Sequence, residues 1–163
     1  EILPNGPKGT HILMAVPRKK PGPRLTHTSV LRRVAPPQSR IRMLIVDDNE
    51  LMREGLRKVL GDQQDLRVIG EASNGEAAVA LTRRLKPDVV LMDVNMPGMD
   101  GIEATRQIRR QVRGAAVIGF SIHEDKHTAE ASKKAGACAY VTKQESPDKL
   151  YDVIRHHSRA RVQ

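Results

Sequence analysis

The chain has 163 residues, of which 39% are hydrophobic, and it carries a formal net charge of +9. This length suits one domain with an appendage, and its core must be aliphatic because the chain has no Trp, one Phe and two Tyr. Cys138 is the only cysteine, which excludes an intrachain disulfide, and no apolar run approaches the roughly 20 residues of a membrane-spanning helix. We therefore expect a cytoplasmic protein that does not contact the membrane.

Residues 1–40 differ in composition from the rest of the chain. They hold seven of the ten prolines and show neither helical nor strand periodicity. Eight Lys or Arg and one acid give residues 1–41 a net charge of +7, which leaves only +2 of the total +9 for the other 122 residues. We interpret residues 1–40 as a disordered basic tail or linker.

Three origins of this tail remain open: a linker to a domain absent from the chain, a nucleic-acid-binding arm, or upstream sequence that is not native. The tail contains no aromatic residue that could stack on bases. Any binding of nucleic acid through the tail should therefore be weak, nonspecific and sensitive to salt.

From Ile41 to His157, apolar runs alternate with amphipathic runs. The predicted strands are Ile41–Val46, Leu66–Gly70, Asp88–Met92, Ala115–Phe120 and Ala137–Val141. The predicted helices are Glu50–Leu60, Gly75–Leu85, Gly101–Gln111, Lys126–Ala135 and Pro147–His157. Five successive strand–helix units predict an α/β fold, a doubly wound five-stranded parallel sheet with five helices. We divide the chain into the tail 1–40, a domain 41–158 and a short C-terminal tail 159–163.

Several helix ends have local causes. Asn74 is a predicted N-cap of the second helix, and Ser146 followed by proline is an N-cap signal for the fifth. Lys86 precedes Pro87, which should end the second helix there. Gly136, after Lys133, Lys134 and Ala135, predicts a glycine stop for the fourth helix.

The residues that follow the strands carry the chemistry. Asp47 and Asp48 follow the first strand, Asp93 the third and Ser121 the fourth, and the fifth strand runs into Lys143. Because the carboxyl ends of parallel strands meet at one edge of a sheet, we expect these side chains to lie together. Three neighbouring carboxylates require a cation, and oxygen ligands with room for phosphate suit Mg²⁺. A carboxylate can act as a nucleophile toward phosphorus, so the pattern predicts an aspartyl phosphate.

At these residues the chain resembles the receiver domains of two-component response regulators, over about Ile41 to His157. The matching stretches are Leu44–Asn49, Val90–Gly101, Phe120–His123 and Ala135–Lys143. The resemblance implies a CheY-like, flavodoxin-like sheet of order 2-1-3-4-5. It is closest to receivers of LuxR, NarL and FixJ-type regulators, which are fused to helix-turn-helix domains. No such domain follows in this chain, so we expect transcriptional regulation through a DNA-binding domain that is absent here.

The resemblance also implies roles for the acidic residues. Asp93 matches the phosphoacceptor, which takes its phosphoryl group from a histidine kinase or a histidine phosphotransfer protein. Asp48 matches a direct Mg²⁺ ligand, Asp47 a ligand that acts through water, and the backbone carbonyl of Asn95 a further ligand. Such a domain catalyses only its own phosphorylation and dephosphorylation, so we do not expect a metabolic enzyme.

The remaining matched residues belong to a switch. Ser121 matches the switch hydroxyl, Lys143 the lysine that pairs with the phosphoryl group, and Tyr140 the aromatic residue that changes rotamer on activation. The resemblance implies that phosphorylation alters the face formed by the fourth helix, fifth strand and fifth helix, with a phosphorylation-dependent homodimer or partner as the result. The chain departs from many relatives in having Gln144 rather than proline after Lys143.

Other functions fit part of the pattern. The domain could be a stand-alone receiver or belong to a hybrid kinase. A phosphatase with an aspartyl-phosphate intermediate would need a second acid at the position of Asn95, and a pseudo-receiver would not need the acid triad. Incubation with a small phosphodonor and Mg²⁺ separates these classes.

Overall fold

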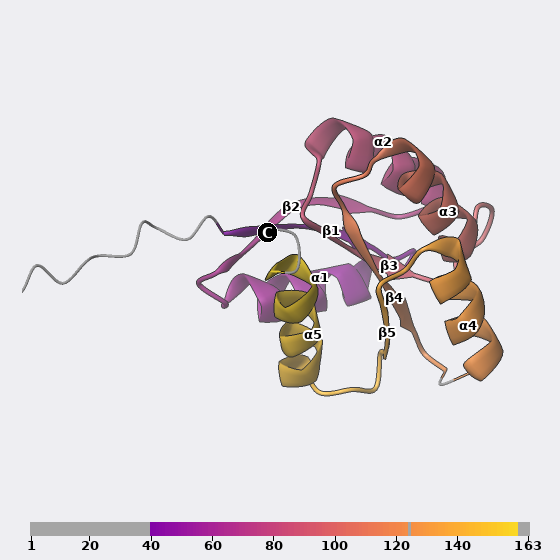
Figure 1. Cartoon of the computed structure of the whole chain (residues 1–163). Coiled ribbons are helices and arrows are strands. Elements are labelled where there is room, and N and C mark those ends of the chain that lie inside the picture. Colours follow the sequence, from indigo (N-terminus) through magenta and orange to yellow (C-terminus); the bar gives the residue numbers. More distant parts are fainter. Residues whose placement is uncertain (1–39, 124, 160–163) are drawn as a thin grey trace, which may run out of the picture. The chain divides into compact units, whose positions relative to one another are not determined.

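The computed structural model describes residues 40–123 and 125–159 (Figure 1). The strands are β1 (Ile41–Val46), β2 (Leu66–Ala72), β3 (Val89–Asp93), β4 (Ala116–Ser121) and β5 (Ala139–Thr142). The helices are α1 (Glu50–Gly61), α2 (Gly75–Leu85), α3 (Gly101–Gln111), α4 (Lys126–Ala135) and α5 (Pro147–Arg159). The strands form one parallel sheet of order β2-β1-β3-β4-β5, which confirms the predicted fold and strand order.

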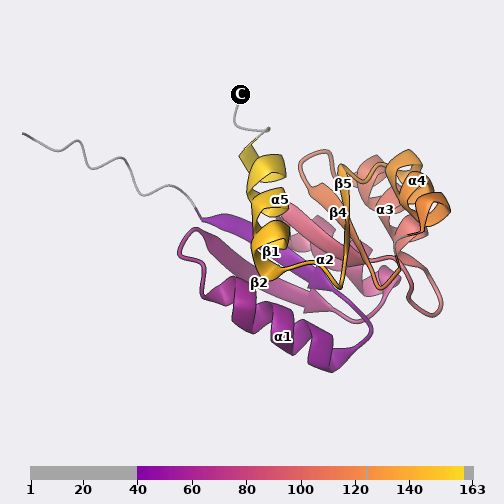
Figure 2. The same ribbon diagram turned by 90° about the horizontal axis from the view of Figure 1, so that it is seen from below.

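The helices cover both faces of the sheet (Figures 1 and 2). On one face, α1 and α5 bury Leu56, Leu60, Leu150 and Ile154 against the strands. On the other face, α2 and α3 bury small and branched residues such as Ala78 against the strand residues that point to that side, for example Leu44 and Val90. All five residues of β3 are buried, as expected for a central parallel strand covered on both faces.

The strand ends differ from the predicted ones by up to two residues. β2 extends to Ala72 because Ala72 pairs with Val46, after a register shift between Met43 and Leu44. β5 begins at Ala139, which pairs with Ile118 of β4, so Ala137 precedes the strand. These ends depend on the neighbouring strand, which hydrophobic runs along the sequence do not reveal.

The helix ends agree with the predicted local signals. The Asn74 side chain accepts a hydrogen bond from the N–H of Ala77, and Gly136 ends α4 in the left-handed conformation with φ 113°. Lys86 ends α2 as predicted, but it does so with φ 47° and ψ 60°, in the left-handed region. The Arg42 guanidinium donates to the carbonyls of Leu85 and Lys86 at 2.7 and 3.1 Å, which stabilises this turn.

The predicted tails 1–40 and 159–163 lie outside the described residues, apart from Arg40 and Arg159. α5 includes Arg159, two residues beyond the predicted end of the fifth helix. Within residues 40–123 and 125–159, no helix is long and apolar enough to cross a membrane.

Candidate phosphorylation site

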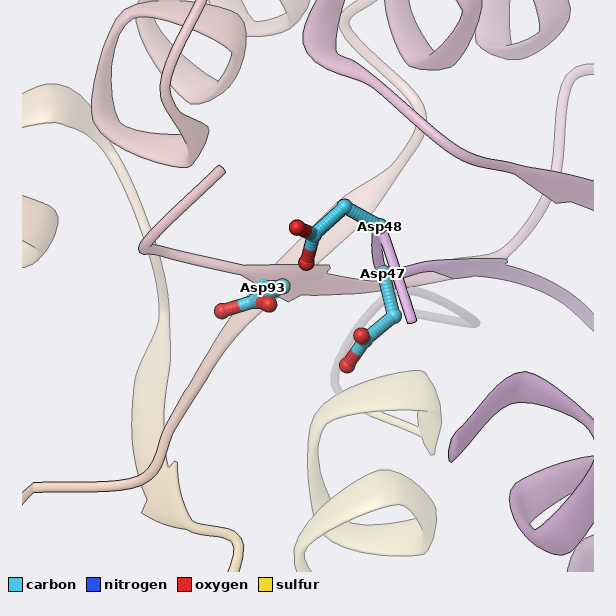
Figure 3. A group of neighbouring side chains, drawn as sticks. All are labelled: Asp47, Asp48 and Asp93. Carbon is cyan, nitrogen blue, oxygen red and sulfur yellow. The ribbon is translucent and has the colours of Figure 1, made fainter. Parts of the chain in front are cut away.

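Three carboxylates meet at the carboxyl end of the sheet. Asp47 directly follows β1, Asp48 is the next residue, and Asp93 is the last residue of β3. One oxygen atom from each lies within 4.8 Å of the others (Figure 3). Asp47 and Asp93 are buried, whereas Asp48 is exposed. The parallel pairing of β1 with β3 brings these residues, which are far apart in sequence, to one edge of the sheet.

Lys143 joins two of these carboxylates. Its Nζ donates to Oδ2 of Asp47 at 2.6 Å and to Oδ2 of Asp93 at 2.9 Å. The Lys143 side chain is only 7% exposed. Burial lowers the pKa of Lys143, but the hydrogen bonds to Asp47 and Asp93 outweigh this effect and hold the pKa above its usual value. The ammonium group is therefore a fixed positive charge in the pocket.

Burial has the largest influence on the pKa of Asp93. It raises the pKa of the carboxyl above its usual value, although the hydrogen bond from Lys143 and the N–H of Asn95 act in the opposite direction. The Asn95 N–H donates to Oδ1 of Asp93 at 3.0 Å. A carboxylate that is poorly hydrated but held by two donors is well oriented as a nucleophile.

The donor atoms of the pocket suit a hard divalent cation. The Asp48 carboxylate and the Asn95 carbonyl have no hydrogen bond or ion pair within the described part of the chain. With all three acids ionised, Lys143 compensates only one of three negative charges, which leaves a net charge of about −2 in the pocket. Oxygen ligands with this charge fit a cation such as Mg²⁺.

Ser121 lies at the same edge, and Asn95 connects it to the acids. The buried Ser121 hydroxyl accepts a hydrogen bond from the Asn95 side chain at 3.0 Å and a longer one from the N–H of His123 at 3.4 Å. The Ser121 carbonyl accepts from the N–H of Lys143 at 2.7 Å. From the sequence, Asn95 was expected to act through its backbone carbonyl, and no sequence pattern indicated that its side chain would reach Ser121.

Tyr140 lies outside the pocket. Its hydroxyl donates to the carbonyl of His123, in the loop after β4, at 3.0 Å. A side chain on Gly119 would place its Cβ 2.7 Å from Ser132 Oγ and 3.0 Å from Tyr140 Cδ2, so glycine allows α4 and β5 to pack closely on β4. Tyr140 is thus connected to Ser121 through the loop that contains His123.

Arg53 of α1 is a further residue at this site, which the sequence analysis missed. Its Nη1 donates to the backbone carbonyl of Asp47 at 2.8 Å. An arginine in the second turn of an amphipathic helix resembles any solvated helical cation, so no sequence signal distinguished it. Among the described residues there is no cis peptide bond, and the bond between Lys143 and Gln144 is therefore trans.

The comparisons with known proteins agree with this geometry. The response regulator receiver domain family matches residues 43–155. The chain is 42% identical over 115 residues to the response regulator UvrY of Escherichia coli K12, covering 71% of this chain and 53% of that protein. It is 43% identical over 119 residues to the transcriptional regulatory protein LiaR of Bacillus subtilis, covering 73% of this chain and 56% of LiaR.

Solved structures show the same similarity. A two-component response regulator of the LuxR family from Aurantimonas superposes with a TM-score of 0.72 at 36% identity, covering 76% of this chain and 88% of that one. The chain spans about half the length of the curated relatives it matches. It belongs to the family of response regulator receiver domains of two-component systems.

Proposed function

We propose that Asp93 accepts a phosphoryl group from a histidine kinase or a histidine phosphotransfer protein, and that this modification controls a signalling surface. The observation that carries the proposal is the pairing of the buried Asp93 carboxylate with Lys143, which also binds Asp47. A structural salt bridge needs one acid and one base. A second buried acid and an unpaired Asp48 beside them suit a site for a cation and a phosphoryl group instead.

Phosphoryl transfer at this site requires little covalent chemistry. A carboxylate oxygen of Asp93 forms a bond to phosphorus, while the bond from phosphorus to the donor's leaving atom breaks and its electron pair stays on that atom. Lys143 pairs with a phosphoryl oxygen, and the Ser121 hydroxyl donates a hydrogen bond to another. Fixed charges and donors at a buried carboxylate supply the positioning and charge neutralisation on which such transfers depend.

Asp47, Asp48, Asp93 and the Asn95 carbonyl would hold Mg²⁺ in this pocket. When bound, the ion would neutralise negative charge on the phosphoryl oxygens. Asp48 would bind it directly, since this carboxylate is exposed and has no partner among the described residues. Asp47, whose two oxygens already accept from Asn49 and Lys143, would bind it through water.

A chain of contacts would carry the change from the pocket to a surface. A phosphoryl group adds roughly −1.5 to −2 charges and three acceptor oxygens beside Ser121. If Ser121 turns toward it, the loop follows, because the N–H of His123 is bound to the Ser121 hydroxyl. The carbonyl of His123 holds the Tyr140 hydroxyl, so Tyr140 would lose this partner and rotate. The affected surface is formed by α4, β5 and α5, where we propose phosphorylation-dependent self-association or partner binding.

Relatives suggest the output of this switch. LiaR is named a transcriptional regulatory protein, and the relatives are about twice as long as their match to this chain. We propose that this receiver acts on transcription through a DNA-binding domain connected to it.

The test is incubation of the chain with a small phosphodonor and Mg²⁺. We expect a stable acyl phosphate on the wild type and none on Asp93→Asn. Asp152→Asn is the matched control, because Asp152 is an exposed aspartate on α5. Equal phosphate incorporation in the Asp93 and Asp152 variants would disprove the assignment, continuous turnover of the donor would indicate a phosphatase, and no reaction at all would indicate a pseudo-receiver.

The switch is tested separately, by comparing size-exclusion mass and amide NMR shifts with and without a phosphoryl mimic and Mg²⁺. Shifts confined to the residues around Asp93, which never reach Tyr140 or the surface of α4 and α5, would exclude this mechanism.

A further inference from the structure

The loop between β1 and α1 consists of only three residues, Asp47, Asp48 and Asn49. The Arg53 guanidinium donates to the backbone carbonyl of Asp47 at 2.8 Å. This carbonyl belongs to the peptide that joins Asp47 to Asp48. The hydrogen bond therefore fixes the plane of that peptide, and with it the direction in which the Asp48 side chain leaves the backbone.

The two acids depend on this peptide to different extents. The Asp47 carboxylate is held by the N–H of Asn49 at 2.9 Å and by Lys143 at 2.6 Å. The Asp48 carboxylate is exposed and has no such partner in the described part of the chain. In Figure 3 it is turned toward Asp93, on the opposite side of the backbone from the Asp47 carboxylate. Within the described residues, only the backbone holds the Asp48 carboxylate in its direction toward the pocket.

Arg53 is itself anchored. Its Nε lies 3.5 Å from Oε2 of Glu71, and its side chain is only 15% exposed. Glu71 is in β2 and pairs with Ile45 of β1, so the anchor is part of the sheet. Arg57, one turn later on α1, also lies 3.5 Å from Glu71, but its side chain is 58% exposed and has no bond to Asp47.

We propose that Arg53 is a positioning residue for the cation site: it connects Glu71 to the Asp47–Asp48 peptide and keeps Asp48 oriented as a metal ligand. This inference rests on the proposed function, in which Asp48 binds Mg²⁺ directly. Groups that orient metal ligands typically contribute about 10–100-fold to metal affinity.

The direction in which Mg²⁺ affinity changes when Arg53 is removed separates a positioning role from a purely electrostatic one. Arg53 is a cation beside a cation site, so its charge alone opposes Mg²⁺ binding, and its removal should strengthen binding if charge is all that matters. If Arg53 orients Asp48, its removal should weaken binding instead. Arg57 carries the same charge and touches the same glutamate, which makes Arg57→Met the matched control.

The experiment is Mg²⁺ titration of the full chain, followed by amide NMR shifts, for the wild type, Arg53→Met, Arg53→Lys and Arg57→Met. We expect Arg53→Met to weaken Mg²⁺ affinity by about tenfold. Arg57→Met should stay within about twofold of the wild type, because exposed charges have small effects. The Mg²⁺ affinity of Arg53→Lys should lie between those of the wild type and Arg53→Met. An ammonium keeps the charge but lacks the planar guanidinium that reaches both Glu71 and the Asp47 carbonyl.

Two further measurements separate positioning from damage to the fold. The melting temperature of each variant reports folding, and acyl-phosphate formation is measured as a function of Mg²⁺ concentration. Arg53→Met should require more Mg²⁺ and approach the wild-type rate when Mg²⁺ saturates. If Arg53→Met does not fold, Arg53→Lys decides the question, and unchanged Mg²⁺ affinity in that variant overturns the proposal.

The outcomes distinguish this inference from the function on which it rests. A wild-type chain that binds no Mg²⁺ refutes the metal site itself. A wild type that binds Mg²⁺, with Arg53→Met binding as tightly or more tightly, refutes only the role of Arg53. An equal loss in Arg53→Met and Arg57→Met also refutes it, because the effect would then come from Glu71 rather than from the Asp47 carbonyl.

Discussion

The start of α3 lies so close to β3 that a single methyl group added at Gly101 should lower the free energy of unfolding substantially. Gly101 begins α3, and a Cβ at this position would lie 2.0 Å from the carbonyl oxygen of Asp93 and 2.8 Å from the Cα of Val94. Both are backbone atoms of the segment that carries the phosphoacceptor, so no side-chain rotation can relieve the clash. The start of α3 would have to move by about 1 Å to reach the closest normal separation of 3.0 Å.

This movement would loosen the packing of α3 on the sheet, where Ala104 and Ile108 are fully buried. Overpacking typically costs about 1–3 kcal/mol, and a clash of a Cβ with backbone atoms belongs at the upper end of that range. We expect Gly101→Ala to lower the free energy of unfolding by about 3 kcal/mol, measured by urea titration. Acyl-phosphate formation should also fall, because the strain acts on the backbone of Asp93.

Gly55 provides the matched control. It lies inside α1, and a Cβ there would meet no atom within 4 Å. Gly55→Ala should raise the free energy of unfolding by about 1 kcal/mol, because alanine favours a helix over glycine by about that amount. The same substitution is thus expected to have opposite signs at two helical positions. A Gly101→Ala variant as stable as the wild type would show that the close approach of α3 to β3 is not required.

Two further predictions concern polar contacts of α4 and α5. The pKa of Asp125 lies below its usual value, because the Asp125 carboxylate accepts hydrogen bonds from the hydroxyl of Thr128 and from the N–H groups of Thr128 and His127. The ionised carboxylate therefore stabilises the folded protein above the pKa that Asp125 has in the unfolded chain. This stabilisation is lost as the pH falls through the lower pKa of the folded state. The difference in urea midpoint between wild type and Asp125→Ala should therefore be constant near neutral pH and shrink below about pH 4, and a difference that persists at about pH 2 would contradict this. Tyr151 donates to Oδ1 of Asp65 at 2.6 Å, so Tyr151→Phe should lower the free energy of unfolding by about 1 kcal/mol. An unchanged urea midpoint in that variant would show that water replaces the hydroxyl without loss.

The elements of the fold could be predicted because their signals are local. A helix such as α2 begins at a capping Asn74 and ends before Pro87, and both signals lie within a few residues of the helix. The end of β2 was placed two residues short, because Ala72 belongs to the sheet only through its pairing with Val46. That pairing follows a register shift between neighbouring strands, which depends on how they meet and leaves no periodic signal in either one.

The same distinction applies to the site. Sequence reasoning was sufficient to place Asp47, Asp48, Asp93, Ser121 and Lys143 at one edge of the sheet, because parallel strands bring their carboxyl ends together. The atoms that meet there could be identified only in the folded chain. Lys143 contacts both Asp47 and Asp93, which are 96 and 50 positions away in the sequence. Whether these contacts form depends on how deeply each of the three side chains lies in the pocket.

The contacts of Arg53, Asn95 and Gly101 were also beyond sequence reasoning. Arg53 reaches the Asp47 carbonyl because α1 packs beside the end of β1, and the Asn95 amide reaches Ser121 because β3 and β4 are adjacent. Periodicity places a residue on a face or at an edge with an accuracy of several ångströms. A hydrogen bond of 2.8 Å or a forbidden Cβ at 2.0 Å is decided by the packing of whole elements against one another, and only the folded chain contains that information.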